Sequence, residues 1–241
     1  MIRRVAATWH VKRWARVAPR LTGAAIIVAF PALYFMELDH GLLGGNWSDW
    51  TGGLSVIAVL VLAAVIGRDV ARPRASWLWL YQKRASVADA AMTGWLMNLG
   101  IAAIALVWWA VVLQVAAGTG GRAADSAVVA SLGQWLALFG TASALLYATA
   151  ALRLEYGVEI LFVLVVAAAV EPLVSLAFAP PVGTTLHLLL PPVGDARALR
   201  VLLSAGEWSG AMRSLAHVCA FMGACLAAGT LMLARWRPGS L

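Results

Sequence analysis

Charged residues are scarce in this chain. Only 12% of its 241 residues are Asp, Glu, Lys or Arg, whereas 62% are hydrophobic and the mean hydropathy is +0.84. A soluble protein has roughly 45–50% apolar and about 25% charged residues. Several stretches of this chain are apolar on every face of a helix. The composition therefore excludes an ordinary soluble fold and predicts that hydrocarbon surrounds most of the chain.

Residues and motifs that carry chemistry are also few. Cys219 and Cys225 are the two cysteines, and their spacing fits neither a zinc site nor a disulfide framework. Lys12 and Lys83 are the two lysines, and neither follows the Gly-rich stretch of a nucleotide-binding loop. The chain also lacks a Gly-x-Ser-x-Gly elbow and a His-Glu-x-x-His motif. These absences predict a protein that is not an enzyme and that itself binds no metal or cofactor.

Long apolar segments are what the sequence has in quantity. A membrane-spanning helix needs about 20 mainly apolar residues to cross about 30 Å of hydrocarbon. Six segments meet or nearly meet this length, so we expect an all-α membrane protein with one transmembrane domain over residues 1–241. The six predicted spans lie at about residues 21–38, 53–70, 93–118, 126–152, 157–179 and 214–236.

The Lys and Arg residues are distributed unevenly between the connections. They are concentrated in residues 1–20, in the second connection, residues 68–92, and after the last span, whereas the first connection, residues 37–50, carries only acids. Cytoplasmic connections are enriched in Lys and Arg, so both termini are expected in the cytoplasm of a multi-pass inner (plasma) membrane protein. The net charge of +7 follows from this topology and does not indicate a nucleic-acid partner.

Two cytoplasmic segments are expected to form helices at the membrane surface. Residues 1–20 combine tryptophan with arginine side chains that can snorkel, which suits the interface. In the second connection Trp77 and Tyr81 share one helical face, and Lys83 and Arg84 add charge just beyond it. The alternative is an amphipathic connection that only rests on lipid headgroups.

Ser86 is placed to cap the helix of the third predicted span. Asp89 follows three positions later, where a capping box carries its acid. The pattern therefore predicts a short interfacial helix, a break, and then the helix of the third span.

The fifth connection, residues 180–213, is long enough to have structure of its own. Proline pairs at positions 180–181 and 191–192 bracket the apolar run 186–190, which is too short to span a membrane. This pattern predicts re-entrant or outer helices that dip into the membrane or lie on it. The alternative is a compact outer loop packed on the bundle.

Polar residues within the predicted spans are few. Glu171 is the one acid well inside a span, where a charge costs roughly 2.5–3.5 kcal/mol. It is expected either to contact substrate or to have its carboxylate satisfied locally, because Pro172 interrupts that span near its outer end. His217, near the start of the last span, is expected to be packed or hydrogen-bonded. The polar residues expected to form hydrogen bonds between helices are Asn98, Gln114 and Gln134.

The order of these parts resembles the membrane subunit of ABC exporters of the second type, the ABC-2 permease family. The best local match is the stretch Trp79-Leu80-Tyr81-Gln82-Lys83-Arg84-Ala85-Ser86. It is similar to the family's aromatic-aliphatic stretch, basic residue and small or hydroxyl residue before the third span. The chain departs from the family at positions 85–87, where a Pro-Val-Ser-like run is common. The likeness covers the whole chain in architecture but only this short stretch in sequence.

The resemblance implies a dimeric permease, with two identical or two different permease chains, that pairs with a separate nucleotide-binding ATPase subunit. ATP and Mg²⁺ would be held by that partner, and membrane lipid would surround the spans. The short helix predicted between the second and third spans would be a cytoplasmic coupling helix. It would dock on the ATPase through Trp77, Trp79, Tyr81, Lys83 and Arg84. Glu171 and His187 are the candidates for the substrate path.

Two other classes of function remain open from the sequence. A structural or assembly subunit of a larger membrane complex would have much the same composition, and a partner with ATPase activity is what distinguishes the exporter. A membrane-embedded enzyme acting on lipid should bring acids, histidines or a nucleophile together at one membrane depth. The sequence predicts no such convergence.

Overall fold

The described part of the chain is entirely helical. The computed structural model describes residues 59, 86–119, 126–151, 182, 185 and 190–235. They include four α-helices, α4 (Val87–Thr119), α5 (Ser126–Ala151), α8 (Val193–Ser204) and α9 (Trp208–Ala234). The prediction of an all-helical chain is confirmed for these residues. The predicted surface helix at 1–20 and the predicted spans at 21–38, 53–70 and 157–179 lie outside them, apart from Val59, which is helical and buried.

Three predicted spans fall on described residues, and each is a helix. Helix α4 contains the predicted span 93–118, and α5 coincides with the predicted span 126–152 to within one residue. The last span is predicted at about 214–236, and α9 begins six residues earlier, at Trp208, as α4 begins six residues before the predicted span 93–118. Hydropathy marks the apolar part of a helix, whereas backbone hydrogen bonding continues through the more polar first turns of α9.

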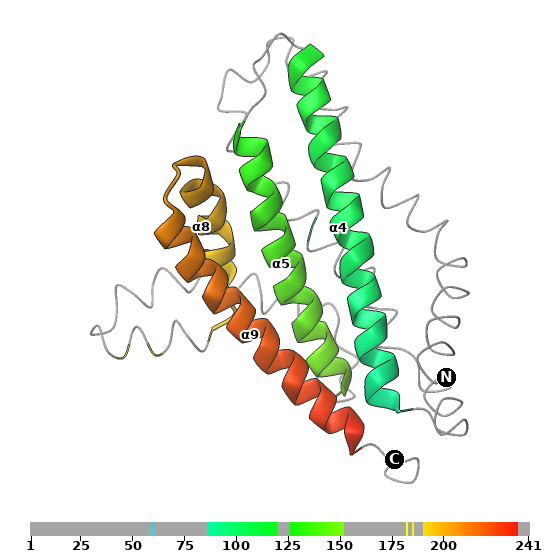
Figure 1. Ribbon diagram of the computed structural model, residues 1–241. Coiled ribbons are helices and arrows are strands. Elements are labelled where there is room, and N and C mark those ends of the chain that lie inside the picture. The colour runs from blue at the N-terminus through cyan, green and yellow to red at the C-terminus, as the bar shows by residue number, and fades with distance from the viewer. Residues whose placement is uncertain are drawn as a thin grey trace.

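The short connection between α4 and α5 predicts antiparallel neighbours, and this prediction is confirmed. Figure 1 shows the two helices side by side, with α9 crossing in front and α8 beside the upper halves of α5 and α9. The first turns of α4 pack against the last turns of α5 and α9, through Val87, Tyr147 and Leu233. Helix α4 therefore runs opposite to both α5 and α9.

Helix α5 lies at the centre of the described bundle and contacts α4, α8 and α9. Its side chains Trp135, Leu138 and Phe139 are each at most 1% exposed. Hydrogen bonds join the helices inside this core: Trp95 Nε1 donates to Ser143 Oγ at 3.1 Å, and the Tyr147 and Thr230 hydroxyls lie 3.1 Å apart. Polar groups removed from water need such partners, so these contacts fix how the helices face one another.

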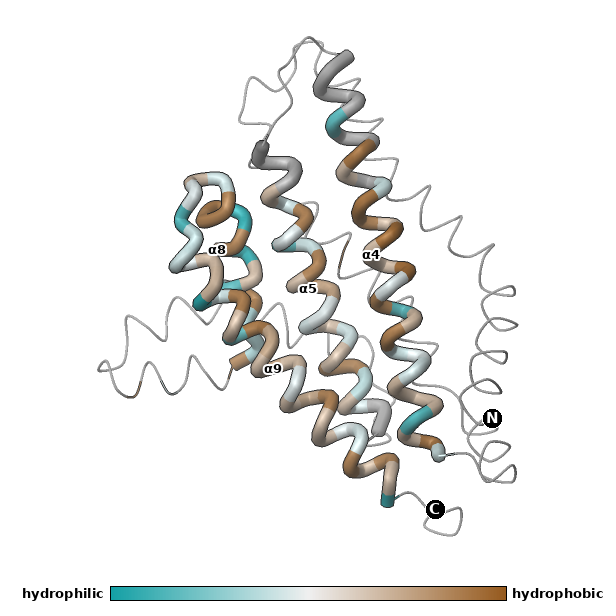
Figure 2. The backbone as a smooth tube through the Cα atoms, in the orientation of Figure 1, coloured by the Kyte–Doolittle hydropathy of each residue, from teal (hydrophilic) through white to brown (hydrophobic). Residues whose placement is uncertain are grey.

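Two of the helices are long and apolar enough to cross a membrane. They are α4, over Val87–Trp108, and α9, over its full length. Only 11% of an apolar stretch of 18 residues in α9 is buried, whereas a core helix of a soluble protein is mostly buried. Figure 2 shows α9 mostly brown to white between its ends, whereas teal segments occur on α8, along α4 and at the C-terminal end of α9. An apolar helix with so little cover favours a membrane protein.

Small residues let α9 approach α5 closely. A Cβ atom added at Gly229 would lie 2.7 Å from the ring of Tyr147 and 3.3 Å from the Cα of Ala148. At Gly140 the added atom would meet the flexible end of Met222, at 2.8 Å from its Sδ. Backbone and a hydrogen-bonded ring cannot move aside as a methionine tip can.

Replacing Gly229 with alanine is therefore expected to destabilise the protein. Overpacking of this kind costs about 1–3 kcal/mol, which lowers the thermal midpoint of the detergent-purified protein. The matched control is Gly223→Ala on the same helix, where an added Cβ meets nothing within 4 Å. We expect that variant to keep the wild-type midpoint or to exceed it, because alanine favours helix. Equal midpoints for the two variants would contradict the close approach of α9 to α5.

The two ends of α9 are expected to react from opposite sides of a membrane. The helix has 27 residues, hence a length of about 40 Å against about 30 Å of hydrocarbon. Cysteines placed at the exposed residues Glu207 and Arg235, in a chain with Cys219 and Cys225 changed to serine, test this. An impermeant maleimide added to intact cells should label Glu207→Cys, whereas Arg235→Cys should react only after permeabilisation. Labelling of both sites in intact cells would show that α9 does not span.

Candidate functional site

The site residues predicted from the sequence lie outside the described residues. These are the coupling residues Trp77, Trp79, Tyr81, Lys83 and Arg84 and the path residues Glu171 and His187. The structure does describe the chain from Ser86, two residues after Arg84, and it describes most of the predicted outer connection.

Ser86 caps α4, as its spacing to Asp89 predicts. The backbone N–H of Asp89 donates to Ser86 Oγ at 3.2 Å, and the backbone N–H of Ala90 donates to the Ser86 carbonyl at 3.1 Å. The first of these bonds satisfies an amide that has no acceptor within the helix, and the second is the first regular hydrogen bond of α4. The Thr93 hydroxyl adds a bond to the Asp89 carbonyl at 2.7 Å. Helix α4 therefore starts at a defined residue, directly after the predicted coupling segment.

The predicted outer connection contains α8, which folds back along α9. Helix α8 begins directly after Pro192, at a position where proline costs no helical hydrogen bond. It ends in a Schellman turn, in which Gly206 has a φ of 73° and the amides of Gly206 and Glu207 bond to the carbonyls of Leu203 and Leu202, at 3.3 and 2.8 Å. Glycine adopts this left-handed conformation without steric cost. The turn sends the chain directly into α9.

Apolar side chains attach α8 to its neighbours. Val193, Ala196 and Leu199 are each at most 3% exposed and belong to the same core as the central residues of α5. Leu202 reaches α9 at Gly210, where an added Cβ would meet it at 3.0 Å. Helix α8 thus packs on both α5 and α9 through its apolar side chains. Its other side is available for polar contacts.

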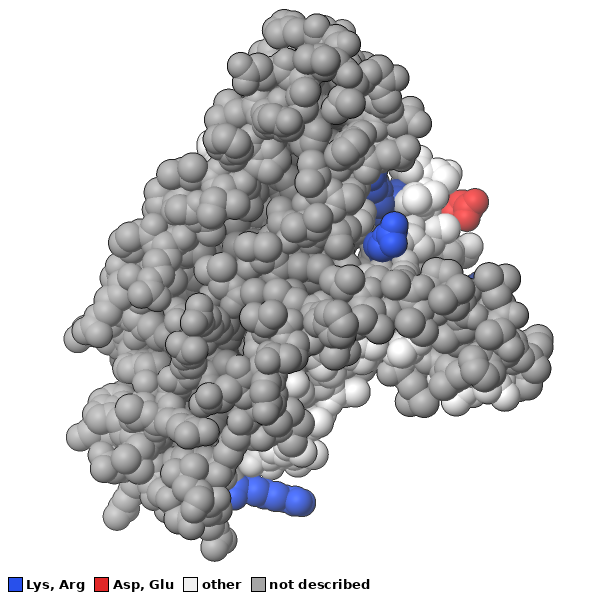
Figure 3. All heavy atoms as spheres, turned by 180° about the vertical axis from the view of Figure 1, so that it is seen from behind, with Lys and Arg blue, Asp and Glu red and all other residues white. Residues whose placement is uncertain are grey.

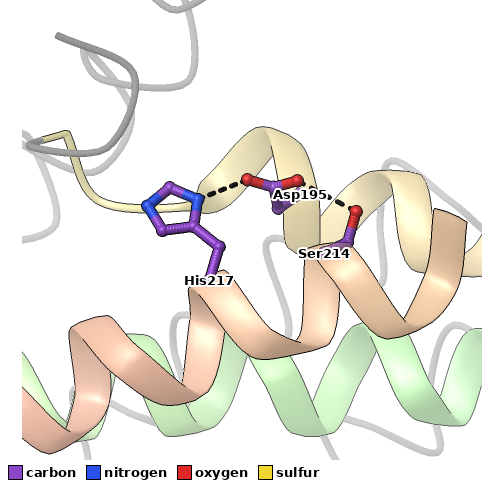
Figure 4. Close-up of polar contacts among 3 residues, drawn as sticks. All are labelled: Asp195, Ser214 and His217. Atoms are coloured by element: carbon purple, nitrogen blue, oxygen red, sulfur yellow. Dashed lines mark hydrogen bonds and ion pairs between the residues drawn. The ribbon is translucent and has the colours of Figure 1, made fainter. Parts of the chain in front are cut away.

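An acid, a hydroxyl and an imidazole meet between α8 and α9. The Ser214 hydroxyl donates to Asp195 Oδ1 at 2.9 Å, and His217 Nδ1 lies 2.6 Å from Asp195 Oδ2. Ser214 and His217 are three residues apart on one face of α9, and Asp195 is in the first turn of α8. Figure 4 shows the Asp195 carboxylate between the two side chains of α9. We call these three residues the Asp195 cluster.

The Asp195 cluster is shielded but not fully buried. The side chain of His217 is 10% exposed and that of Asp195 is 17% exposed. In the described helices, α5 has no charged residue and α4 has Asp89 in its first turn, whereas α8 also carries Arg197 and Arg200 and α9 carries Arg213. Figure 3 shows the visible charged side chains near the α8 end and at the opposite end of the bundle. The cluster is a polar contact that joins α8 to α9 beyond their connecting turn.

The geometry of the cluster argues against a nucleophile relay. In a Ser-His-Asp triad the imidazole lies between the hydroxyl and the carboxylate, so that it takes the serine proton. Here the carboxylate lies between the other two groups, and the Ser214 hydroxyl donates to it directly. The meeting of an acid and a histidine here was not predicted from the sequence, because Asp195 and His217 are far apart along the chain. What converges is a hydrogen-bonded tie between helices.

His217 was predicted to be packed or hydrogen-bonded, and this is confirmed by its contact with Asp195. Asn98 and Gln134, predicted to act between helices, are buried at 8% and 3% exposure. Within the four described helices, no group of three or more His, Cys, Asp or Glu side chains could hold a metal ion. Asp195 itself was not identified from the sequence. The signal in the sequence was the i, i+3 spacing of Ser214 and His217 on α9. This spacing indicates a shared hydrogen-bond acceptor but does not identify the residue that supplies it.

Removing the Asp195 carboxylate is expected to destabilise the protein. Asp195→Ala leaves Ser214 and His217 without their shared acceptor, which costs about 1–3 kcal/mol and lowers the thermal midpoint in detergent. Because the two partners interact, Asp195→Ala combined with His217→Ala should cost less than the sum of the single changes. Ser204→Ala is the control, since that exposed hydroxyl bonds only to the Val201 carbonyl of its own helix. Additive costs at Asp195 and His217 would disprove the pairing.

Comparisons with known proteins identify no relative of this chain. Neither the protein-family models, nor the curated proteins, nor the solved structures contain a match. Inferences about function therefore rest on the residues and contacts described above.

Proposed function

We propose that this chain is the membrane-spanning permease subunit of an ABC exporter, with six transmembrane helices and both termini in the cytoplasm. In this proposal a separate nucleotide-binding subunit hydrolyses ATP, and its closure moves the spans of a permease dimer. The observation that carries the proposal is the α8–α9 hairpin, a short helix folded back along the start of a long and largely uncovered apolar helix.

The hairpin places α8 beside the outer part of α9. Asp195 contacts Ser214 and His217, so α8 reaches down α9 as far as nine residues from Trp208, a depth of about 14 Å. A helix that returns within the connection and lies along α9 over this length supports the predicted re-entrant or outer helices over a compact outer loop packed on the bundle. This is the arrangement that the resemblance to ABC-2 permeases implies for the fifth connection.

The other end of the described bundle supports a role in coupling. Helix α4 is a continuous helix of 33 residues that starts at the Ser86 cap, directly after the segment from Trp77 to Arg84. It contacts both α5 and α9. A force applied to the coupling segment would therefore reach the centre of the bundle through one rigid element. The defined start of α4 suits this use, because a frayed first turn would absorb the movement.

Pull-down of the detergent-solubilised chain tests the proposal. A nucleotide-binding ATPase should co-purify with the wild-type protein. The amount of ATPase that co-purifies with the double variant Tyr81→Ala with Arg84→Ala should be at least tenfold lower, because aromatic and arginine anchors dominate such interfaces. Glu207→Gln is the matched control and should retain the ATPase, because Glu207 precedes the end of α9 that lies away from the start of α4. Insertion of each variant is checked by its yield in the membrane fraction.

Two results would contradict the exporter. Undiminished binding and ATP turnover in the double variant would exclude the coupling role of Tyr81 and Arg84. A native assembly without any ATP-hydrolysing component would exclude the exporter altogether and favour a structural subunit of a membrane complex.

A further inference from the structure

We propose that the α8–α9 hairpin binds the phosphate groups of anionic phospholipids through Arg197, Arg200 and Arg213. We call these three residues the arginine belt. The inference rests on α9 crossing a membrane, which the proposed exporter also requires, but it does not rest on an ATPase partner or on transport.

The three arginines lie at one level of the hairpin. Asp195 on α8 contacts Ser214 on α9. Leu202, further along α8, lies beside Gly210, so the two helices are antiparallel. Arg213 lies between these two contact points on α9, and both arginines of α8 lie between them on α8. The belt therefore brings three positive charges to the same height from two different helices.

This height is where the apolar part of α9 ends. From Ser214 to Ala234 the helix contains no Asp, Glu, Lys or Arg. That stretch is about 30 Å long, which equals the thickness of the hydrocarbon layer of a bilayer. Arg235 follows it at one end, and Arg213 precedes it at the other. The belt is therefore expected at the boundary of the hydrocarbon, beside the phosphate groups of the lipids.

The belt has no protein partner that neutralises it in the described part of the chain. No hydrogen bond or ion pair joins any of its three side chains to another residue there. Arg197 and Arg213 are exposed and Arg200 is partly exposed. Figure 3 shows basic side chains at the surface near the α8 end of the bundle. The guanidinium groups are thus accessible to an anion from outside the protein.

Charge complementarity and the neighbouring apolar side chains identify that anion as a phospholipid. A guanidinium is always charged, and its planar fork of donors matches two oxygens of a phosphate. Exposed apolar side chains surround the belt in the sequence, at Val201, Trp208, Met212 and Leu215. Basic and apolar residues together are typical of a surface that lies on lipid, with tryptophan at the level of the headgroups. A phospholipid contacts both kinds of side chain, whereas a soluble anion would contact the arginines alone.

Fluorescence quenching by spin-labelled lipid tests the belt on the full-length protein in phosphatidylcholine nanodiscs. A bimane fluorophore is attached at Val201→Cys, an exposed position next to Arg200, in a chain with Cys219 and Cys225 changed to serine. The quenchers are phosphatidylglycerol and phosphatidylcholine, each with a nitroxide near the head of one acyl chain. Phosphatidylglycerol should reach half-quenching at a mole fraction at least about fivefold lower, the preference that one arginine gives at an anionic membrane surface.

Changing all three arginines of the belt to glutamine should abolish this preference, whereas changing them to lysine should retain most of it. Arg235→Gln, the same change of charge at the opposite end of α9, is the matched control and should keep the full preference. The double variant Arg197→Gln with Arg200→Gln leaves α9 unchanged. It should lower the preference, and it keeps the proposal testable if the triple variant does not fold.

Equal quenching by the two lipids in the chain that retains all its arginines would overturn the belt. A full preference for phosphatidylglycerol in the glutamine variants would also overturn it, because other basic residues would then supply it. The quenching involves no ATPase, so its outcome is separate from that of the pull-down.

Discussion

The arrangement described here depends on the medium around α9. A largely uncovered apolar helix of 27 residues exposes apolar surface whose contact with water is unfavourable. In hydrocarbon the same surface costs nothing, and backbone polar groups are satisfied within the helix. The central position of α5 follows from the same constraint. Two of its polar side chains, Ser143 and Tyr147, have partners on α4 and α9, where these bonds replace the water that lipid cannot supply.

Polar contacts acquire a particular importance in such a bundle. Lipid is as apolar as leucine, so helices in a membrane associate through close packing and hydrogen bonds rather than through the hydrophobic effect. Both features occur where α5 meets α9, at Gly229 and at the Tyr147–Thr230 contact. The Asp195 cluster has the same role at the other end of α9. It differs in containing an acid and an imidazole, at Asp195 and His217.

Much of the described fold could be predicted from local sequence. The positions of α4, α5 and α9 followed from apolar length, and the start of α4 followed from Ser86 and Asp89, because a capping bond involves only residues within one turn. The start of α9 was not predicted, since it is set by the turn at Gly206 rather than by hydropathy. Asp195 was missed for a different reason. Its partner His217 is 22 residues away, and only the folding of α8 back onto α9 brings the two together.

Lipid exposure along α9 is the quantity that tests this account most directly. A nitroxide moved one residue at a time from position 208 to position 234 reports its collisions with oxygen, which concentrates in hydrocarbon, and with a water-soluble nickel complex. The account predicts that oxygen collisions dominate in the middle of the helix, with a period of about 3.6 residues and minima at the residues that face α5. Uniformly high collisions with the nickel complex along the helix would contradict it, because α9 would then lie in water.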